Sequence, residues 1–311
     1  MNIIRKQITG ILIVAAVAMG WFSCSESFLD EELKTQRNDS YFNTEEGIGD
    51  AVVSLYNYFR YPFTGEQGLA TTMYGTDEFT VGGDNSNHDW NDYTSNLSPS
   101  VISINSNTVS MNAVWDNMYR AISMANLVLA NVDEAVTVEG SRTLYKAEAS
   151  FSRAFNYFTL VQQYGGVVLK LEPSQGVERY FVRSSCEECV NRIIEDFRVA
   201  YTGLPATEQE EGRLYKDVAA HFLAKALLYR VSEINDDWNG AHKTSDLAEI
   251  ITLCNEVIGK HSLASDFRDL FDFQQSDGPN EFLSEIIFAA QFSNAATAAE
   301  GNWYHLYFTS Q

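Results

Sequence analysis

The sequence is poor in basic residues and in cysteine, and these two shortages exclude several classes of protein. Lysine and arginine total 21 against 42 acidic residues, which gives a formal net charge of −21 over 311 residues. A chain this acidic is repelled by phosphate backbones, so nucleic acid is not expected as a partner. Of the four cysteines, Cys24 follows a predicted export signal, and the odd number that remains argues against a disulfide framework. A hydrophobic content of 45% is too high for intrinsic disorder.

Long apolar runs and catalytic motifs are also scarce. The one long apolar run, from Ile8 to Phe22, is shorter than the roughly 20 residues that a spanning helix needs. There is no phosphate-binding loop, nucleophile elbow or zinc-protease helix. A glycosidase carboxylate pair can be neither excluded nor located by counting 42 acidic residues. The sequence therefore assigns no catalytic residue and indicates no cofactor.

Residues 1–23 have the pattern of an export signal. Two basic residues precede an apolar run over residues 11–19, and Cys24 follows directly after a small residue. This arrangement is typical of a bacterial lipoprotein signal, in which the cysteine is lipidated and becomes the new N-terminus. An ordinary signal peptide with an incidental cysteine is the alternative. If Cys24 carries lipid, acyl chains attach the protein to the membrane, and the polar, acidic residues 24–43 form a tether.

Six helices are predicted after the tether, with a long polar insertion behind the first. Thr44 is a good N-cap for the first helix, and Pro62 stops it. The insertion, residues 64–107, is rich in Gly, Asn, Asp and Ser, and long loops of this kind are often functional. Apolar residues spaced by three and four then predict helices over residues 108–132, 144–164, 184–203, 215–229 and 245–257.

These helices also carry predictions about their ends and faces. Ser184 and Glu187 form an expected capping box, and Gly165 with Gly166 is an expected C-cap. The helix over 215–229 is apolar nearly all round, so it is expected to be central. Trp115 and Cys254 lie in apolar stripes and are expected in the core. Paired helices with short turns indicate a mostly α fold, a tetratricopeptide-like hairpin stack over residues 44–311.

Short segments spread over nearly the whole length carry a resemblance to a known family. The most specific stretch is Glu148–Phe158 with Tyr164–Gly166 behind it. The other matching segments are Cys24–Asp30, Tyr41–Glu46, Ala51–Tyr56, Trp115–Tyr119 with Ile122 and Asn126, Gly212–Arg213, Ala219–Ala220, Leu223–Ala224 and Glu285–Phe288. In this order they resemble the SusD/RagB family of Bacteroidetes outer-membrane lipoproteins. Family members are considerably longer, so the sequence is expected to lack the C-terminal part of the family domain.

The resemblance implies a protein without catalytic activity at the cell surface. Such proteins capture oligosaccharides, or in some members peptides, and form a lid on a SusC-like TonB-dependent transporter of the outer membrane. In the family, part of the ligand site comes from the loop between the first two helices, which corresponds to residues 64–107. Two alternatives stay open: a helical-repeat lipoprotein that acts as a protein-interaction scaffold, and a lipid-anchored glycoside hydrolase.

The insertion contains the residue types that a sugar site needs. A sugar offers an apolar C–H face to a flat aromatic ring and hydroxyl pairs to amides or carboxylates. The first candidates for binding a sugar lie in the insertion: Asp77, Asn85, Asn87, Asp89, Trp90, Asn91 and Tyr93. Trp303 and Tyr304 are second candidates outside it, as is the pair Trp238–Asn239. The alternative is a solvated loop whose tryptophan fills a small hydrophobic gap.

Metal and redox chemistry find little support. Cys186 and Cys189 form a single CxxC at a predicted helix start, whereas a structural zinc needs four ligands. The two intervening glutamates oppose the lowered thiol pKa of redox motifs, so a local disulfide or two plain thiols are expected. The stretch from Asp84 to His88 does not follow the calcium-loop pattern. No metal site is predicted.

Overall fold

The computed structural model describes residues 39–60, 73, 75–77, 106–174, 176–271 and 283–291. Residues 42–311 form one unit and residues 1–41 another, and all the α-helices described below belong to the unit of residues 42–311. The predicted export signal and Cys24 lie outside the described residues. Of the expected tether, residues Asp39–Asn43 form a 3-10 helix, η2.

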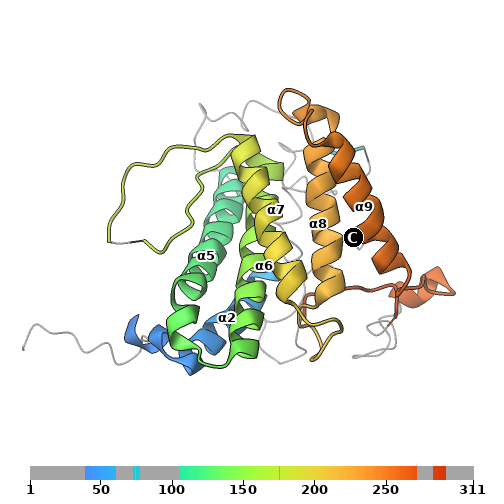
Figure 1. The fold of residues 1–311 in the computed structure, drawn as a ribbon. Coiled ribbons are helices and arrows are strands. Elements are labelled where there is room, and N and C mark those ends of the chain that lie inside the picture. Colours follow the sequence, from blue (N-terminus) through green and yellow to red (C-terminus); the bar gives the residue numbers. More distant parts are fainter. Residues whose placement is uncertain are drawn as a thin grey trace, which may run out of the picture. The chain divides into compact units, whose positions relative to one another are not determined.

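The described part of the chain contains six α-helices and no β-strand. Each helix packs mainly against the next along the chain, so that successive helices lie side by side (Figure 1). Two short 3-10 helices, η6 (Glu233–Asn235) and η7 (Phe267–Phe271), precede and follow the last α-helix. The mostly α, tetratricopeptide-like stack is therefore confirmed. Its helices are α2 (Glu45–Phe59), α5 (Ser106–Ala135), α6 (Glu139–Tyr164), α7 (Cys186–Gly203), α8 (Lys216–Val231) and α9 (Lys243–Ile258).

Two of the predicted helix caps are confirmed and one is wrong, and α6 begins at Glu139, five residues before its predicted start. Thr44 accepts a hydrogen bond from the Gly47 amide at 3.1 Å and caps α2, as predicted. Gly165, at a φ of 70°, ends α6 with its amide bonded to the carbonyl of Val161. The predicted capping box of α7 is wrong by one residue, because Ser185 and Glu188 form it. The Ser184 amide donates to the Val167 carbonyl at 2.8 Å and therefore does not donate to a glutamate side chain, as a capping box requires. Ser185 takes the N-cap position instead.

Helix α6, rather than α8, is the most enclosed helix. It contacts α2, α5, α7 and α8, and every residue from 147 to 158 is buried. Leu228, on the helix expected to be central, is 55% exposed. Aromatic rings of α6 tie the stack together, with Phe151 at 5.8 Å from Phe59 of α2 and 5.3 Å from Phe197 of α7. Burial of each such side chain contributes roughly 1.5–3 kcal/mol.

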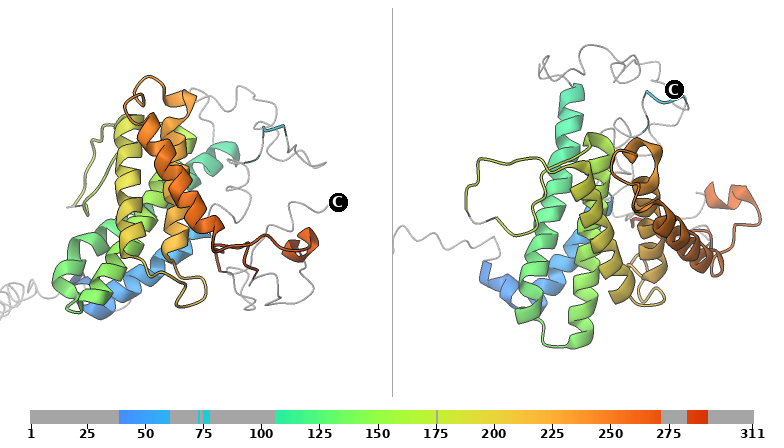
Figure 2. Two further views of the ribbon diagram at one scale, coloured as in Figure 1. Left: turned by 45° about the vertical axis from the view of Figure 1, so that its right-hand side comes forward. Right: turned by 45° about the horizontal axis from the view of Figure 1, so that its top comes forward.

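Helix α9 buries only part of its apolar residues. Leu253 and Val257 are buried against α8, whereas Leu247 is 47% exposed. Cys254, expected in the core, is exposed. The prediction for Cys254 is therefore wrong, and α9 carries apolar residues on its outer side. Figures 1 and 2 show α9 at one edge of the row of helices.

Two connections complete the described chain. The one between α6 and α7 leaves the helices and returns beside α5 (Figure 2). The segment 283–291, which contains the matching stretch Glu285–Phe288, has no strand. Phe288 packs against the core, with its ring 5.7 Å from that of Phe59. Of the insertion expected over 64–107, the last two residues belong to α5, and most of the rest lies outside the described residues.

Candidate functional site

A cavity of about 280 Å³ lies between α5 and the connection that joins α6 to α7. α5 forms one wall, and the other wall is formed by five residues of the connection, Val168, Lys170, Glu172, Ser174 and Phe181. This volume is near the lower end for small-molecule sites, which span roughly 300–1,000 Å³. The lining residues are Trp115, Tyr119, Ile122, Ser123, Asn126, Val168, Lys170, Glu172, Ser174 and Phe181.

Trp115 and Tyr119 form an aromatic wall of this cavity. They lie about one turn apart on α5, and their ring centroids are 4.9 Å apart. Tyr164 supports Trp115 edge to face at 5.2 Å. The Tyr119 hydroxyl donates to the Val168 carbonyl at 2.8 Å, and burial raises the pKa of Tyr119 well above its ordinary value. The aromatic wall is therefore uncharged at neutral pH. Tyr164 fixes the position of Trp115, and the Val168 carbonyl fixes that of Tyr119.

Charged and hydroxyl groups stand at the rim. The Lys170 ammonium lies 2.6 and 2.7 Å from the two carboxylate oxygens of Glu178. Glu172 and Ser174 are exposed beside it, and Ser123 is exposed on α5. One ammonium against two carboxylates leaves a negative surplus, which disfavours an anionic ligand.

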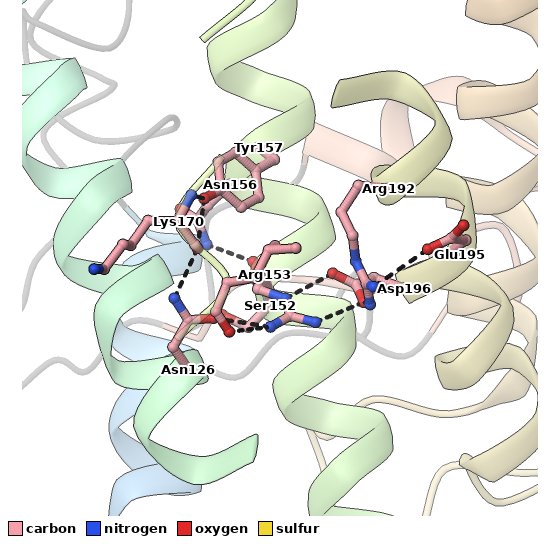
Figure 3. Close-up of polar contacts among 10 residues, drawn as sticks. Asn126, Ser152, Arg153, Asn156, Tyr157, Lys170, Arg192, Glu195 and Asp196 are labelled. Atoms are coloured by element: carbon pink, nitrogen blue, oxygen red, sulfur yellow. Dashed lines mark hydrogen bonds and ion pairs between the residues drawn. The ribbon is translucent and has the colours of Figure 1, made fainter. Parts of the chain in front are cut away.

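A buried polar network fixes the backbone of Lys170 (Figure 3). Asn126 Nδ2 donates to the Lys170 carbonyl at 2.8 Å. The Tyr157 hydroxyl accepts from the Lys170 amide and donates to its carbonyl, both at 2.7 Å. Asn126 Oδ1 accepts from Arg153 at 2.8 Å, so the wall is bound to α5 and α6 together.

The same network continues to α7. Arg153 forms two hydrogen bonds with Asp196, at 2.7 and 2.9 Å, and the Asp196 side chain is fully buried. Arg192 contacts the same carboxylate from α7, and Arg153 also reaches the Leu171 carbonyl at 3.3 Å. Sequence reasoning did not find this network. Its signal is the polar residues Asn126 and Arg153 within otherwise apolar helical patterns.

Comparison with known proteins decides the family. A family model described as "Starch-binding associating with outer membrane" matches residues 27–231. The chain belongs to the SusD-like family.

Relatives in this family are longer than the chain. A SusD-like protein of Formosa agariphila is 25% identical over 299 residues, which cover 92% of this chain and 52% of the relative. A SusD-like protein of Bacteroides ovatus is 25% identical over 290 residues, or 88% of this chain and 49% of the relative. The chain thus spans about half the length of the relatives it matches.

Solved structures of the family share the fold. A laminarin-binding SusD-like protein matches with a TM-score of 0.60 at 20% identity, over 74% of this chain and 50% of that protein. A crystal structure with xylogluco-oligosaccharide gives 0.61 at 22% identity, over 82% and 48%. A SusD superfamily protein from Bacteroides vulgatus gives 0.63 at 21% identity, over 85% and 55%. At these identities the likeness shows the fold alone.

The predicted ligand residues fall mostly outside the described residues. Asp77 is exposed in a bend, whereas Trp303, Tyr304 and the candidates at 85–93 lie beyond the described ranges. Asn239 is fully buried and donates to the carbonyls of Arg230 and Ser232 at 2.9 and 3.0 Å, so its role is structural. Trp115, expected in the core, packs against the core with one side and lines the cavity with the other.

The three described cysteines are free thiols. Burial raises the pKa of both Cys186 and Cys189, which is the opposite of an activated redox pair. Within the described residues, no three His, Cys, Asp or Glu side chains lie close enough to hold a metal ion. In the same part of the chain, no helix combines the length and hydropathy needed to cross a membrane.

Proposed function

We propose that this chain is a lipoprotein of the cell surface, attached to the outer membrane through lipid on Cys24. It binds a glycan without cleaving it and passes the glycan to a SusC-like TonB-dependent transporter. The family match over residues 27–231 carries the proposal, because that family is described as starch-binding and associated with the outer membrane. Structural relatives described with laminarin and with a xylogluco-oligosaccharide support a glycan as the ligand.

The cavity beside α5 supplies the chemistry for a neutral sugar unit. The rings of Trp115 and Tyr119 cover the C–H face of a pyranose, and Lys170 and Ser174 at the rim bind its hydroxyl groups. The volume of about 280 Å³ suits a single unit, with the rest of an oligosaccharide outside the cavity. The predicted residues around Trp90 form a second contact region for the same ligand.

Calorimetric titration of the full chain with starch, laminarin and xyloglucan oligosaccharides tests this proposal. Loss of an aromatic stacking contact worth about 1.4 kcal/mol weakens binding about tenfold, so Trp115→Ala and Trp90→Ala are each expected to show at least that loss. Tyr180→Ala is the matched control, because Tyr180 lies on the same connection but is 96% exposed and does not line the cavity. An unchanged affinity in Trp115→Ala would refute the cavity as the site.

Three further observations separate glycan delivery from its alternatives. Mass spectrometry of the oligosaccharides after incubation is expected to show unchanged lengths, and shortened products would favour a hydrolase. Palmitate labelling in cells is expected to mark the wild type but not Cys24→Ser. Affinity purification from native membranes is expected to recover a TonB-dependent transporter. Binding of protein partners with no response to any glycan would favour the scaffold alternative.

A further inference from the structure

Lys170, at the rim of the cavity beside α5, is held at both its backbone and its ammonium group. Asn126 donates to the Lys170 carbonyl at 2.8 Å, and the Tyr157 hydroxyl bonds to its amide and carbonyl, both at 2.7 Å (Figure 3). The ammonium lies 2.6 and 2.7 Å from the two carboxylate oxygens of Glu178. The Lys170 and Glu178 side chains are 29% and 31% exposed, so water covers the pair only in part. The position of the ammonium therefore depends on Glu178.

Glu178 also sets the charge that a ligand meets at this lysine. An ammonium has three N–H donors, and the two hydrogen bonds to Glu178 leave one donor for a sugar hydroxyl. The pair as a whole is neutral, and Glu172, which lines the cavity, adds a further negative charge. A hydroxyl group can therefore bind to Lys170, whereas a ligand carboxylate would compete with Glu178 for the ammonium and would be repelled by Glu172.

The other two basic residues of the connection, Arg179 and Arg183, do not line the cavity. Arg183 donates instead to the backbone carbonyls of Gly166 and Tyr164. Among the described residues that line the cavity, Lys170 is thus the single cation. Whether this cation is available to a ligand carboxylate is decided by its pairing with Glu178.

We propose that Glu178 makes the cavity selective for neutral sugars over acidic sugars such as uronic acids. Because this selectivity belongs to the glycan site, it rests on the proposed function, and it adds the residue that determines the class of sugar. Glu178 is a positioning residue that acts through Lys170, since it does not itself line the cavity. Glu178→Gln keeps an oxygen that accepts from Lys170 but removes the negative charge, so that the ammonium becomes available to a ligand carboxylate.

Calorimetric titration of the full chain with matched pairs of ligands tests this selectivity. Each pair consists of a starch or laminarin oligosaccharide and the same oligosaccharide with its C6 hydroxyl groups oxidised to carboxylates. The wild type is expected to bind the neutral member more tightly. Glu178→Gln is expected to raise the ratio of the acidic to the neutral association constant about tenfold, because it removes one charge roughly 5 Å from the ligand carboxylate. Glu249→Gln is the matched control on α9, because Glu249 is also ion-paired and its side chain is 30% exposed, and it is expected to leave the ratio unchanged.

Added salt and a double variant separate the effect of charge from a change in structure. The gain in Glu178→Gln is expected to shrink as salt is added, because salt screens a partly exposed charge, whereas a gain from repacking would persist. Lys170→Met combined with Glu178→Gln restores the net charge of the rim and is expected to return the ratio to about the wild-type value.

Three outcomes would overturn the role of Glu178 while leaving glycan binding intact. They are a wild type that binds the acidic member more tightly, a ratio in Glu178→Gln no higher than in Glu249→Gln, and a gain that survives Lys170→Met. If neither the wild type nor Glu178→Gln binds any of these oligosaccharides, the proposed function is itself refuted, and the selectivity with it.

Discussion

The substitution Arg153→Met removes the central group of the buried network and is expected to be strongly destabilising. The Arg153 side chain is 7% exposed, and its partner Asp196 is fully buried. Breaking a buried pair by removing one member costs about 3–5 kcal/mol, because the remaining charge stays desolvated. Arg192 still contacts Asp196, which places the expected loss near the lower end, about 3 kcal/mol. The acceptors on Asn126 and Leu171 also lose their donor.

Urea unfolding followed by far-UV circular dichroism measures this loss as a shift in the free energy of unfolding. Arg198→Met is the matched control, because Arg198 pairs with Glu249 at the surface, where the two side chains are 46% and 30% exposed. Exposed pairs contribute less than about 1 kcal/mol. If Arg153→Met is no more destabilising than Arg198→Met, the assignment of the network as the support of the cavity wall is wrong.

A second substitution separates the pair from its surroundings. Asp196→Asn added to Arg153→Met removes the buried negative charge that the first change leaves behind, so the double variant is expected to recover part of the loss. The interaction free energy from the full cycle is then positive and larger than about 1 kcal/mol. Strictly additive losses would mean that Arg153 and Asp196 act independently, in contradiction to their two short hydrogen bonds.

Three other outcomes follow from single positions. Gly166→Ala is expected to lower the free energy of unfolding by about 2 kcal/mol or more, because the added Cβ would lie 2.2 Å from the Ser184 carbonyl oxygen. Gly140→Ala is the control: its Cβ would meet no atom within 4 Å, so this variant is expected to be neutral or stabilising. Burial raises the pKa of Glu148, so its contribution to stability is present below its ordinary value of 4.5 and is lost as the pH rises through the raised pKa. The stability of the wild type relative to Glu148→Gln is therefore expected to fall as the pH rises, as urea midpoints at several pH values will show. Disulfide-exchange reagents are expected to modify exposed Cys254 first and buried Cys189 only on unfolding, with the order read by mass spectrometry.

The positions of the helices were predictable because their signals are local. Apolar spacing and caps such as Thr44 are determined by residues a few positions apart, and the Thr44 cap is confirmed. The capping box of α7 was missed by one residue because adjacent serines and adjacent glutamates offer two equivalent pairings. A long-range contact, the hydrogen bond from the Ser184 amide to Val167, selects Ser185. No pattern within the helix itself contains that information.

The candidate site was only half visible in the sequence. The stripe that contains Trp115 and Tyr119 identifies one face of α5, but a stripe alone does not distinguish a core residue from a cavity wall. The opposite wall comes from a connection more than forty positions away, with Val168 bonded to Tyr119 across 49 residues. The bonds from Asn126 and Tyr157 to Lys170 fix that wall, and they depend on the packed tertiary structure.

Helix α9 shows how a buried ion pair sets an orientation that hydrophobicity leaves open. The helix has apolar residues on two faces, so the periodic pattern fits either one as the core face. Asp246 and Arg230 are both nearly fully buried and are joined by two hydrogen bonds, at 2.7 and 2.8 Å. If α9 were turned to bury Leu247 and Ile251, this pair would separate and leave two charges without partners, a cost of several kcal/mol. That cost exceeds what the two apolar side chains gain from fuller burial, since each is already partly covered. The ion pair therefore keeps Leu247 and Ile251 on the outer side of α9.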